Sequence, residues 1–206
     1  MFSKNMKMKF HFFYITIFII SILPYSCTTE PEGCGTGFTE IKGQCYNDVD
    51  LAVLQEFIDN SSTTIPMTWD ADNSGSIEPL ELQTQKWNES GRLTRLWLYN
   101  YTINDDYSMS GKIPENIGDL TYLDTLNLAF NQIIGGIPES MGRLNNLVFA
   151  YLYHNQLSGI IPDSICNIYP NLKHFRIFEN QFCPPYPSCI PIEKINPQNT
   201  SSCSEN

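Results

Sequence analysis

Three stretches of the chain share one pattern: "GKIPENIGDL" (Gly111–Leu120), "GGIPESMGRL" (Gly135–Leu144) and "GIIPDSICNI" (Gly159–Ile168). They start 24 residues apart. The segments between them match as well, because "LDTLNLAFNQIIG" begins at Leu123 and "LVFAYLYHNQLSG" begins at Leu147. A fixed period of this length is typical of a solenoid, in which each unit buries its apolar side only by stacking on its neighbours.

The repeat continues in both directions. A later unit, "LKHFRIFENQFC", begins at Leu172, one residue late, and an early unit, "LTRLWL", begins at Leu93. The early unit is irregular, because six extra residues lie around "NYTINDDYS" and the asparagine of the other units is missing. We therefore predict about four repeats over residues 93–182.

Each unit predicts one short strand followed by a turn. Apolar residues alternate along the strand and point to one side of it: Leu126 and Leu128, Ala150 and Leu152, and Phe175 and Ile177. An amide side chain after each strand can satisfy buried backbone groups where the chain turns, at Asn131, Asn155 and Asn180. A proline then turns the returning segment without requiring a donor, at Pro114, Pro138 and Pro162.

This pattern resembles the plant-type, 24-residue class of the leucine-rich repeat family, whose motif is LxxLxLxxNxLxGxIP. The resemblance covers about Leu93 to Cys189. It implies an α/β repeat fold, a short curved solenoid with a parallel sheet on its concave side. It also implies that ligands bind through exposed strand positions, and rarely that the protein is an enzyme.

The two ends of a solenoid need caps. The segment "DLAVLQEFIDN" (Asp50–Asn60) predicts a helix with one apolar face, formed by Leu51, Leu54, Phe57 and Ile58. Trp69, Trp87 and "GRLTRLWL" follow it, and this arrangement resembles the N-terminal cap of plant-type repeats. We expect this helical cap over residues 34–92 and a disulfide-stapled, Pro- and Cys-rich C-terminal cap over residues 183–206.

The N-terminus predicts an export signal over residues 1–26. Lys4, Lys7 and Lys9 precede the apolar run Phe10–Leu23, which has 14 residues. A spanning helix needs about 20 apolar residues, so a signal peptide is the better interpretation. Its removal takes away three lysines and no acidic residue, so the formal charge changes from −10 to −13. That charge excludes nucleic acid and acidic membrane surfaces as favourable partners.

The chain has seven cysteines, an odd number for an exported protein. Cys27 directly follows the signal, which resembles a bacterial lipoprotein signal, although Pro24 stands where leucine is usual. We expect lipidation at Cys27 and a tether over residues 27–33. Six cysteines then remain for three disulfides in an oxidising compartment. The alternative is plain secretion with one spare thiol.

Six cysteines allow 15 pairings, and the sequence alone does not choose among them. We favour pairs that close short local loops and staple the ends of the domain: Cys34 with Cys45, Cys166 with Cys183, and Cys189 with Cys203. The main alternative is a local bridge between Cys183 and Cys189.

The segment "DADNSGSIEPLE" (Asp70–Glu81) resembles an EF-hand loop. Gly75 falls at its sixth position, where the chain must turn sharply. The predicted calcium ligands are Asp70, Asp72, Ser74, Ser76 through its carbonyl, Glu78 and Glu81. Pro66 opposes an entering helix, whereas "PLELQTQKW" is acceptable as an exit helix. Extracellular modules of this kind bind calcium with dissociation constants of about 10⁻⁴–10⁻³ M. At that affinity, calcium would have a structural role and stabilise the N-terminal cap. The alternative is a solvated turn.

Outward positions on the predicted strands form columns, because neighbouring strands lie about 4.8 Å apart. These columns are Arg95, Thr125, Phe149 and His174; Trp97, Asn127, Tyr151 and Arg176; Tyr99, Ala129, Tyr153 and Phe178; and Asn100, Phe130, His154 and Glu179. Aromatic and arginine side chains mark interface hot spots. We therefore predict that one continuous ligand-binding surface contains Arg95, Trp97, Tyr99, Phe130, Phe149, Tyr151, Tyr153, His174, Arg176 and Phe178. The alternative is an aromatic ladder that only stabilises the sheet.

The sequence does not indicate an enzyme. It has no phosphate-binding glycine loop, nucleophile elbow or zinc-ligand spacing. We expect a monomeric, lipid-anchored module of the cell envelope or surface that recognises a protein, peptide or glycan through its concave aromatic face. The alternative is a structural envelope or adhesion component without a discrete ligand.

Overall fold

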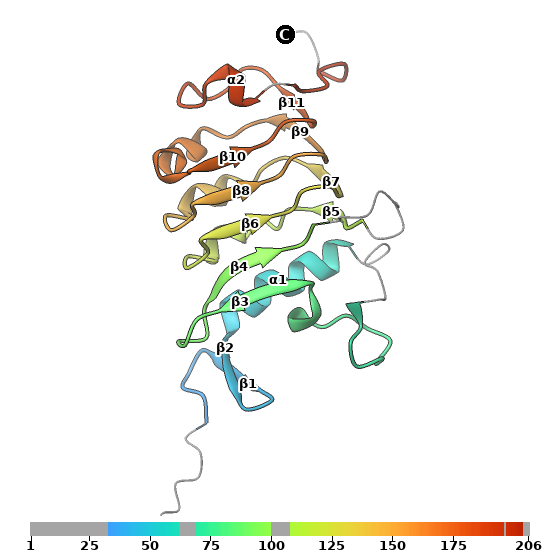
Figure 1. The fold of residues 1–206 in the computed structure, drawn as a ribbon, viewed down its shortest axis with the longest axis vertical. Coiled ribbons are helices and arrows are strands. Elements are labelled where there is room, and N and C mark those ends of the chain that lie inside the picture. Colours follow the sequence, from blue (N-terminus) through green and yellow to red (C-terminus); the bar gives the residue numbers. More distant parts are fainter. Residues whose placement is uncertain (1–32, 62–68, 100–107, 196, 204–206) are drawn as a thin grey trace, which may run out of the picture. The chain divides into compact units, whose positions relative to one another are not determined.

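The computed structural model describes residues 33–61, 69–99, 108–195 and 197–203 (Figure 1). Residues Gly33–Asn206 form one compact unit that contains every described helix and strand. The predicted signal peptide, the lipidation of Cys27 and all of the predicted tether except Gly33 lie outside the described residues. Within the described part of the chain, no helix is long and apolar enough to cross a membrane.

The first sheet has five strands in the order β10-β8-β6-β4-β3. Four are the predicted strands of the repeats, and they run parallel: β4 (Leu93–Trp97), β6 (Thr125–Asn127), β8 (Phe149–Tyr151) and β10 (His174–Arg176). The fifth strand, β3 (Thr84–Trp87), pairs antiparallel with β4. The parallel sheet is as predicted from the sequence, whereas β3 was not predicted.

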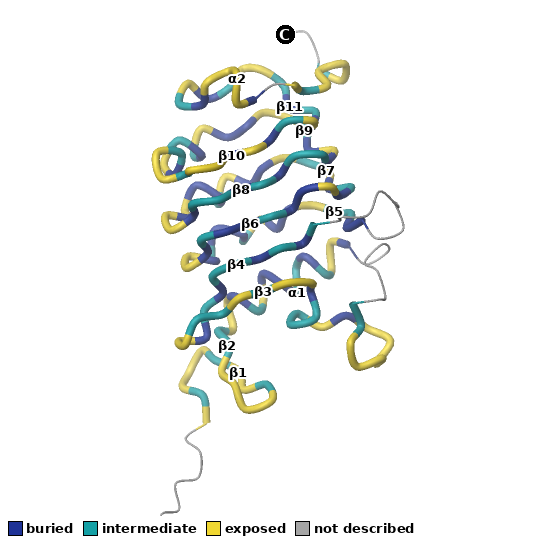
Figure 2. Tube along the Cα trace, viewed as in Figure 1, coloured by how far each residue is buried: buried dark blue, intermediate teal, exposed yellow. Residues whose placement is uncertain are grey.

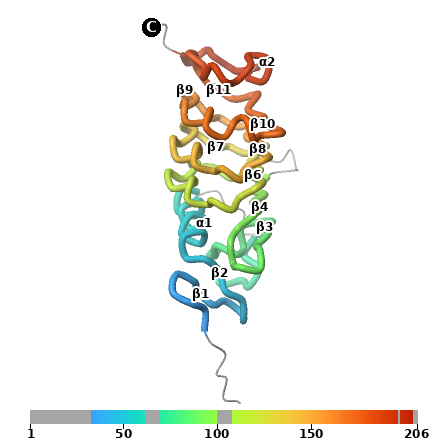
Figure 3. The backbone as a smooth tube through the Cα atoms, turned by 90° about the vertical axis from the view of Figure 1, so that its left-hand side faces the viewer, coloured from blue at the N-terminus to red at the C-terminus, as the bar shows by residue number. Residues whose placement is uncertain are grey.

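A second sheet lies on the other side of the solenoid (Figure 3). Its four strands have the order β11-β9-β7-β5, and they are β5 (Ser110–Lys112), β7 (Gln132–Gly135), β9 (Gln156–Ile160) and β11 (Gln181–Cys183). Short 3-10 helices connect it back to the first sheet, at η4 (Ile117–Asp119), η5 (Glu139–Arg143), η6 (Asp163–Asn167) and η7 (Tyr169–Asn171). This second sheet was not predicted from the sequence.

The core lies between the two sheets and the 3-10 helices, and Figure 2 shows its buried residues recurring along the stacked strands. The alternating apolar residues predicted for the strands are all buried: Leu126, Leu128, Ala150, Leu152, Phe175 and Ile177. Each repeat therefore covers the apolar side of the next, as expected for a solenoid.

A ladder of buried asparagines joins the repeats. Asn155 Nδ2 donates to the carbonyl oxygens of Leu128 at 2.8 Å and Leu152 at 3.1 Å, and Asn155 Oδ1 accepts from Ile133 N at 3.0 Å. Asn131 and Asn180 make equivalent bonds. The predicted role of these amides, to satisfy backbone groups at the turn, is confirmed.

The N-terminal cap consists of a hairpin, β1 (Phe38–Ile41) and β2 (Gln44–Asn47), and the helix α1 (Asp48–Ser61). Leu54 and Phe57 on α1 are buried as predicted. The other two residues of the predicted apolar face are only half-buried, and Val53 is buried instead. The buried face is therefore rotated slightly from the prediction.

A buried ion pair fixes α1 to the first repeat. Arg92 Nε and Nη2 each donate to the Asp50 carboxylate at 2.9 Å, and Leu93 N donates to the same carboxylate at 2.8 Å. Asp50 has no exposed surface. Hydrogen bonding to Asp50 raises the pKa of Arg92 above its ordinary value. This ion pair was not predicted from the sequence.

The described cysteines form three disulfides. Cys34–Cys45 is confirmed, with its Cα atoms 5.5 Å apart. The other two predicted pairs are wrong, because the structure has Cys166–Cys189 and Cys183–Cys203, each with Cα atoms 5.6 Å apart.

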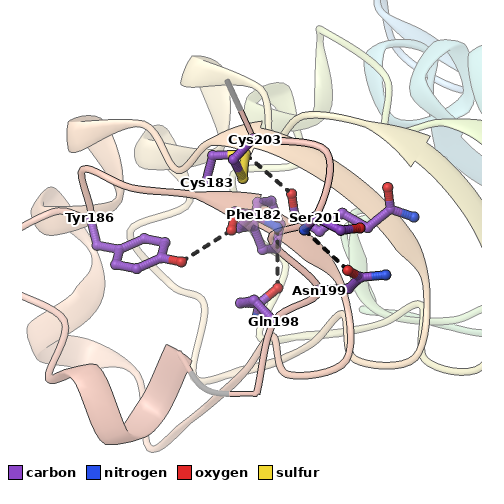
Figure 4. The surroundings of a disulfide bond; sticks show 8 residues. Phe182, Cys183, Tyr186, Gln198, Asn199, Ser201 and Cys203 are labelled. Carbon is purple, nitrogen blue, oxygen red and sulfur yellow. Dashed lines mark hydrogen bonds between the residues drawn. A yellow bond between two sulfur atoms is a disulfide. The ribbon is translucent and has the colours of Figure 1, made fainter. Parts of the chain in front are cut away.

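The reason for this pairing is the path of the C-terminal cap. The final segment returns beside β11, where Gln198 Oε1 accepts from Phe182 N at 3.2 Å, and this brings Cys203 to Cys183 (Figure 4). Cys189 then lies within reach of Cys166 on η6. The C-terminal cap is thus stapled as predicted, but by longer loops.

Candidate ligand-binding face

The predicted columns are the observed cross-strand register. Residues at equivalent positions pair directly across the first sheet: Arg95, Thr125, Phe149 and His174 in one column, and Trp97, Asn127, Tyr151 and Arg176 in the next. The residues between the two columns are buried, at Leu96, Leu126, Ala150 and Phe175. Because side chains alternate along a strand, the two columns face away from the core.

Seven rings on this face are in mutual contact and form what we call the aromatic cluster: Phe130, Phe149, Tyr151, Tyr153, His154, His174 and Phe178. Its closest contacts are stacked, with ring centroids 4.4 Å apart for Phe130 and His154 and 4.7 Å apart for Tyr153 and Phe178. Tyr151 links the two halves through an edge contact with Tyr153.

Polar contacts hold the histidines of the cluster. Tyr151 Oη lies 2.9 Å from His174 Nδ1, and His154 Nδ1 lies 2.7 Å from a carboxylate oxygen of Glu179. His154 belongs to the aromatic cluster although it was not among the predicted ligand-binding residues. Its signal in the sequence was its column, which it shares with Phe130 and Glu179.

The backbone turns that carry this last column are unusual. Phe130, His154 and Glu179 have φ values of 56°, 53° and 53°. Non-glycine residues rarely adopt the left-handed region. Each of these residues directly precedes a ladder asparagine, so the same turn recurs in three successive repeats and aims each side chain at the aromatic cluster.

The predicted surface is not continuous across the whole sheet. On β6 and just after it, Thr125 is only 6% exposed and Ala129 only 1% exposed, so both predicted outward positions are wrong as exposed sites. Arg95 pairs with Asp124 at 3.3 Å. Among the described residues, no ring contact joins Trp97 to the aromatic cluster. The structure therefore brings together the predicted residues of β8 and β10 and separates them from those of β4.

The acidic loop brings together three of its six predicted ligands. Carboxylate oxygens of Asp70, Asp72 and Glu81 lie within 4.8 Å of one another. Gly75 turns the chain with a φ of 86°. Hydrogen bonds from the side chain and then the backbone of Ser74 lower the pKa of Asp72 below its ordinary value. The donor set fits a hard cation, which prefers oxygen ligands.

The remaining loop residues bond to one another. Ser74 Oγ donates to the Ser76 carbonyl at 3.1 Å, and Glu78 N donates to Glu81 at 3.0 Å. The predicted exit helix is wrong: only Pro79–Glu81 form a short 3-10 helix (η2), and β3 follows. Pairing with β4 is the reason, because it extends the chain that would otherwise continue the helix. The entering side at residues 62–68 lies outside the described residues.

Comparisons with known proteins agree with this architecture. The family model described as Leucine Rich Repeat matches residues 122–144 and 146–168. The fold is a leucine-rich repeat solenoid. No curated protein matches the sequence of the chain.

Solved structures share the fold over about two thirds of the chain. A plant ice-binding protein is 25% identical with a TM-score of 0.51, over 66% of this chain and 42% of that chain. A chain of the BIR3–SERK2 complex from Arabidopsis thaliana is 22% identical with a TM-score of 0.52, over 71% and 77% of the two chains. The Arabidopsis receptor kinase HAESA, solved with the peptide hormone IDA and the co-receptor SERK1, is 22% identical with a TM-score of 0.53, over 68% and 23%.

Proposed function

We propose that the protein is an exported binding module whose aromatic cluster takes a protein or peptide segment. The observation that carries this proposal is the cluster itself, seven rings gathered on one sheet face with Phe130 44% exposed at its margin. Tyrosine and arginine dominate the energetics of protein interfaces. Rigid rings also lose little conformational entropy when a ligand orders them. No catalytic step is proposed.

Similar folds are used for binding by other proteins. The HAESA structure contains a peptide hormone, although its likeness to this chain concerns the fold alone. The chain spans less than half of the ice-binding protein and less than a quarter of HAESA. The support for the proposal therefore comes from the side chains of the cluster. The competing proposal is a structural envelope component, in which the rings only stabilise the sheet.

Selection from a displayed random 12-residue peptide library tests the proposal. Residues 33–206 serve as the target, since they form a compact unit. Peptides enriched on the wild type should lose binding to Tyr153→Ala, because this ring contacts four other rings of the cluster. Tyr122→Ala is the matched control, because Tyr122 is 49% exposed and its ring lies against Arg92, 4.5 Å from the guanidinium carbon. Among the described residues, it contacts no ring of the aromatic cluster.

The outcomes separate the alternatives. Loss of binding in Tyr153→Ala and retention in Tyr122→Ala supports the ligand face. Equal binding to both variants, or no enrichment together with a lower thermal midpoint for Tyr153→Ala, supports the structural role instead. A parallel glycan array distinguishes a carbohydrate ligand from a peptide.

We further propose that calcium binds the loop Asp70–Glu81 and staples the N-terminal cap. The three converging carboxylates support this site, and further oxygens are available from Ser74, Ser76 and Glu78. At 100 times its dissociation constant, a ligand adds about 2.7 kcal/mol to the free energy of unfolding. The thermal midpoint should rise in 10 mM calcium relative to chelator, and Asp70→Ala should abolish the rise. Asp163→Ala, an exposed acid on η6, is the control. An equal midpoint in calcium and chelator would refute the site.

Export and anchoring complete the proposal. Three disulfides are expected of a protein in an oxidising compartment. We propose that a lipid on Cys27 holds the module at the cell envelope or surface. Mass spectrometry of the N-terminal peptide after expression in a bacterium tests this directly. A lipid-mass increment that Cys27→Ser removes supports the anchor, and an unmodified Cys27 contradicts it.

A further inference from the structure

A pocket of about 310 Å³ lies at the C-terminal end of the aromatic cluster, between β10 and α2 (Ile192–Ile195). His174 and Phe178 belong both to the aromatic cluster and to the pocket lining. Tyr169 adds a further aromatic wall. The pocket therefore continues the candidate ligand-binding face and has the size of a small ligand site.

The pocket lining is mainly basic, whereas the protein as a whole is acidic. The chain has 22 acidic and 12 basic residues, yet the lining contains Lys173, Arg176 and Lys194 with Glu193 as its only acidic residue. None of these three cations forms an ion pair with a described residue.

Other arginines of the chain behave differently. Arg92, Arg95 and Arg143 each pair with an aspartate, at 2.9, 3.3 and 2.6 Å. Unpaired cations that converge on a pocket beside aromatic walls are chemically suited to a carboxylate ligand. Repulsion from the distant acidic surface is screened beyond about 8 Å at physiological salt, whereas contacts inside the pocket are screened much less.

The backbone beside the pocket favours a polypeptide ligand. One hydrogen bond recurs between successive strands: the carbonyl of Thr94 accepts from Asp124 N at 2.7 Å, that of Asp124 from Val148 N at 2.9 Å, and that of Val148 from Lys173 N at 2.9 Å. The Lys173 carbonyl is the next acceptor of this series. No described residue donates to it, because β10 is the edge of the sheet.

The C-terminal segment lines the pocket through Glu193 and Lys194 but donates no backbone hydrogen bond to the Lys173 carbonyl. It rejoins the ladder further along, where Glu179 N donates to the carbonyl of Pro197 at 2.7 Å. An extended peptide can supply an N–H to an open strand edge, while its side chains reach neighbouring pockets. Lys173 offers both the open carbonyl and one of the cationic side chains.

We propose that this pocket binds an acidic, extended polypeptide segment of a partner protein. Its carboxylates lie against Lys173, Arg176 and Lys194, one backbone N–H bonds to the Lys173 carbonyl, and its apolar side chains lie on the aromatic cluster. This inference rests on the proposed function of the cluster and specifies the chemistry of the ligand.

Fluorescence anisotropy with three labelled decapeptides tests the inference on residues 33–206. The peptides alternate valine with glutamate, with serine or with lysine. The glutamate peptide should bind at least about tenfold more tightly than the other two, and its affinity should fall with added salt. Arg176→Glu and Lys194→Glu should each weaken its binding about tenfold or more. Lys112→Glu, an exposed lysine on the second sheet, should leave it unchanged.

Two further probes test the backbone hydrogen bond and the source of the anionic group. A glutamate peptide with N-methylated backbone amides should bind more weakly, because it has no N–H to donate to the Lys173 carbonyl; equal affinity would overturn the strand-edge contact. Oligogalacturonate that binds as tightly as the glutamate peptide would overturn the assignment to a polypeptide. Glutamate and serine peptides of equal affinity, including no binding of either, would overturn the inference entirely.

The design separates this inference from the proposed function. If Arg176→Glu retains the peptides selected from the library while Tyr153→Ala loses them, the aromatic cluster is the binding face and the acidic-ligand inference is wrong. If Tyr153→Ala also retains them, the proposed function itself fails. Unchanged thermal midpoints of both variants show that the comparison concerns binding and not folding.

Discussion

Replacing Asp50 by alanine should destabilise the protein strongly. The Asp50 carboxylate has no exposed surface and accepts three hydrogen bonds, two from the Arg92 guanidinium and one from Leu93 N. Alanine at this position leaves a cation without its partner and a buried backbone donor without an acceptor. These losses fall at the junction between α1 and β4.

The size of the effect follows from these contacts. Removing one member of a buried ion pair costs about 3–5 kcal/mol. The Arg92 side chain keeps 17% exposure, so water compensates part of that loss and we expect about 3 kcal/mol. This is a large fraction of the total, since a typical domain unfolds with about 5–15 kcal/mol.

Urea unfolding of residues 33–206, followed by far-UV circular dichroism, measures this change. Asp50→Asn should lower the free energy of unfolding by less than Asp50→Ala does, because its amide oxygen can still accept the hydrogen bond from Leu93 N. Asp119→Ala is the matched control: its ion pair with Arg143 is exposed at both ends, so it should cost less than about 1 kcal/mol. If Asp50→Ala costs no more than Asp119→Ala, the reasoning that the buried pair fixes the cap is refuted.

Three other changes probe the repeats and the C-terminal cap. Asn155→Ala leaves Ile133 N without its acceptor and removes one of two side-chain amide donors from the Leu128 and Leu152 carbonyls. It should lower the free energy of unfolding in urea by about 1–3 kcal/mol; an unchanged free energy of unfolding would contradict the ladder. Replacing Cys183 and Cys203 by serine should cost about 3 kcal/mol, and peptide mapping of the unreduced wild type should recover them as one linked pair. Gly118→Ala should lower the thermal midpoint, because an added methyl group would overlap the carbonyl oxygen of Ser140; an unchanged midpoint would contradict that close approach.

Much of the fold was predictable because the same sequence pattern occurs in three successive repeats, and each occurrence supports the same interpretation. The register of the first sheet, the buried strand residues and the asparagine ladder all follow from a period of 24 residues and alternation along a strand. The Asp50–Arg92 pair was not predictable in this way, because it occurs once. Nothing local distinguishes Asp50 from the solvated acid Asp48 two residues earlier.

The candidate site shows the same limit. Register placed the aromatic side chains in columns correctly, but it did not show that Thr125 and Ala129 interrupt them. Local loop length was also a poor guide to the disulfides, since the path of the returning C-terminal segment decides which partner Cys183 meets. Strand β3 was not predicted, because its sequence was interpreted as part of a helix. Pairing with β4 extends this segment and overrides its local helical propensity.

Strand β3 also bears on how the protein avoids assembling with itself. A stack of parallel strands has an open edge at its first strand, and such an edge is a template for another chain. The antiparallel β3 occupies that edge of β4. It then presents its own margin with Lys86 exposed, and a lysine on an edge strand discourages further pairing. The sheet therefore has a built-in stop at its N-terminal end, which keeps a repetitive protein from growing into a fibre from that side.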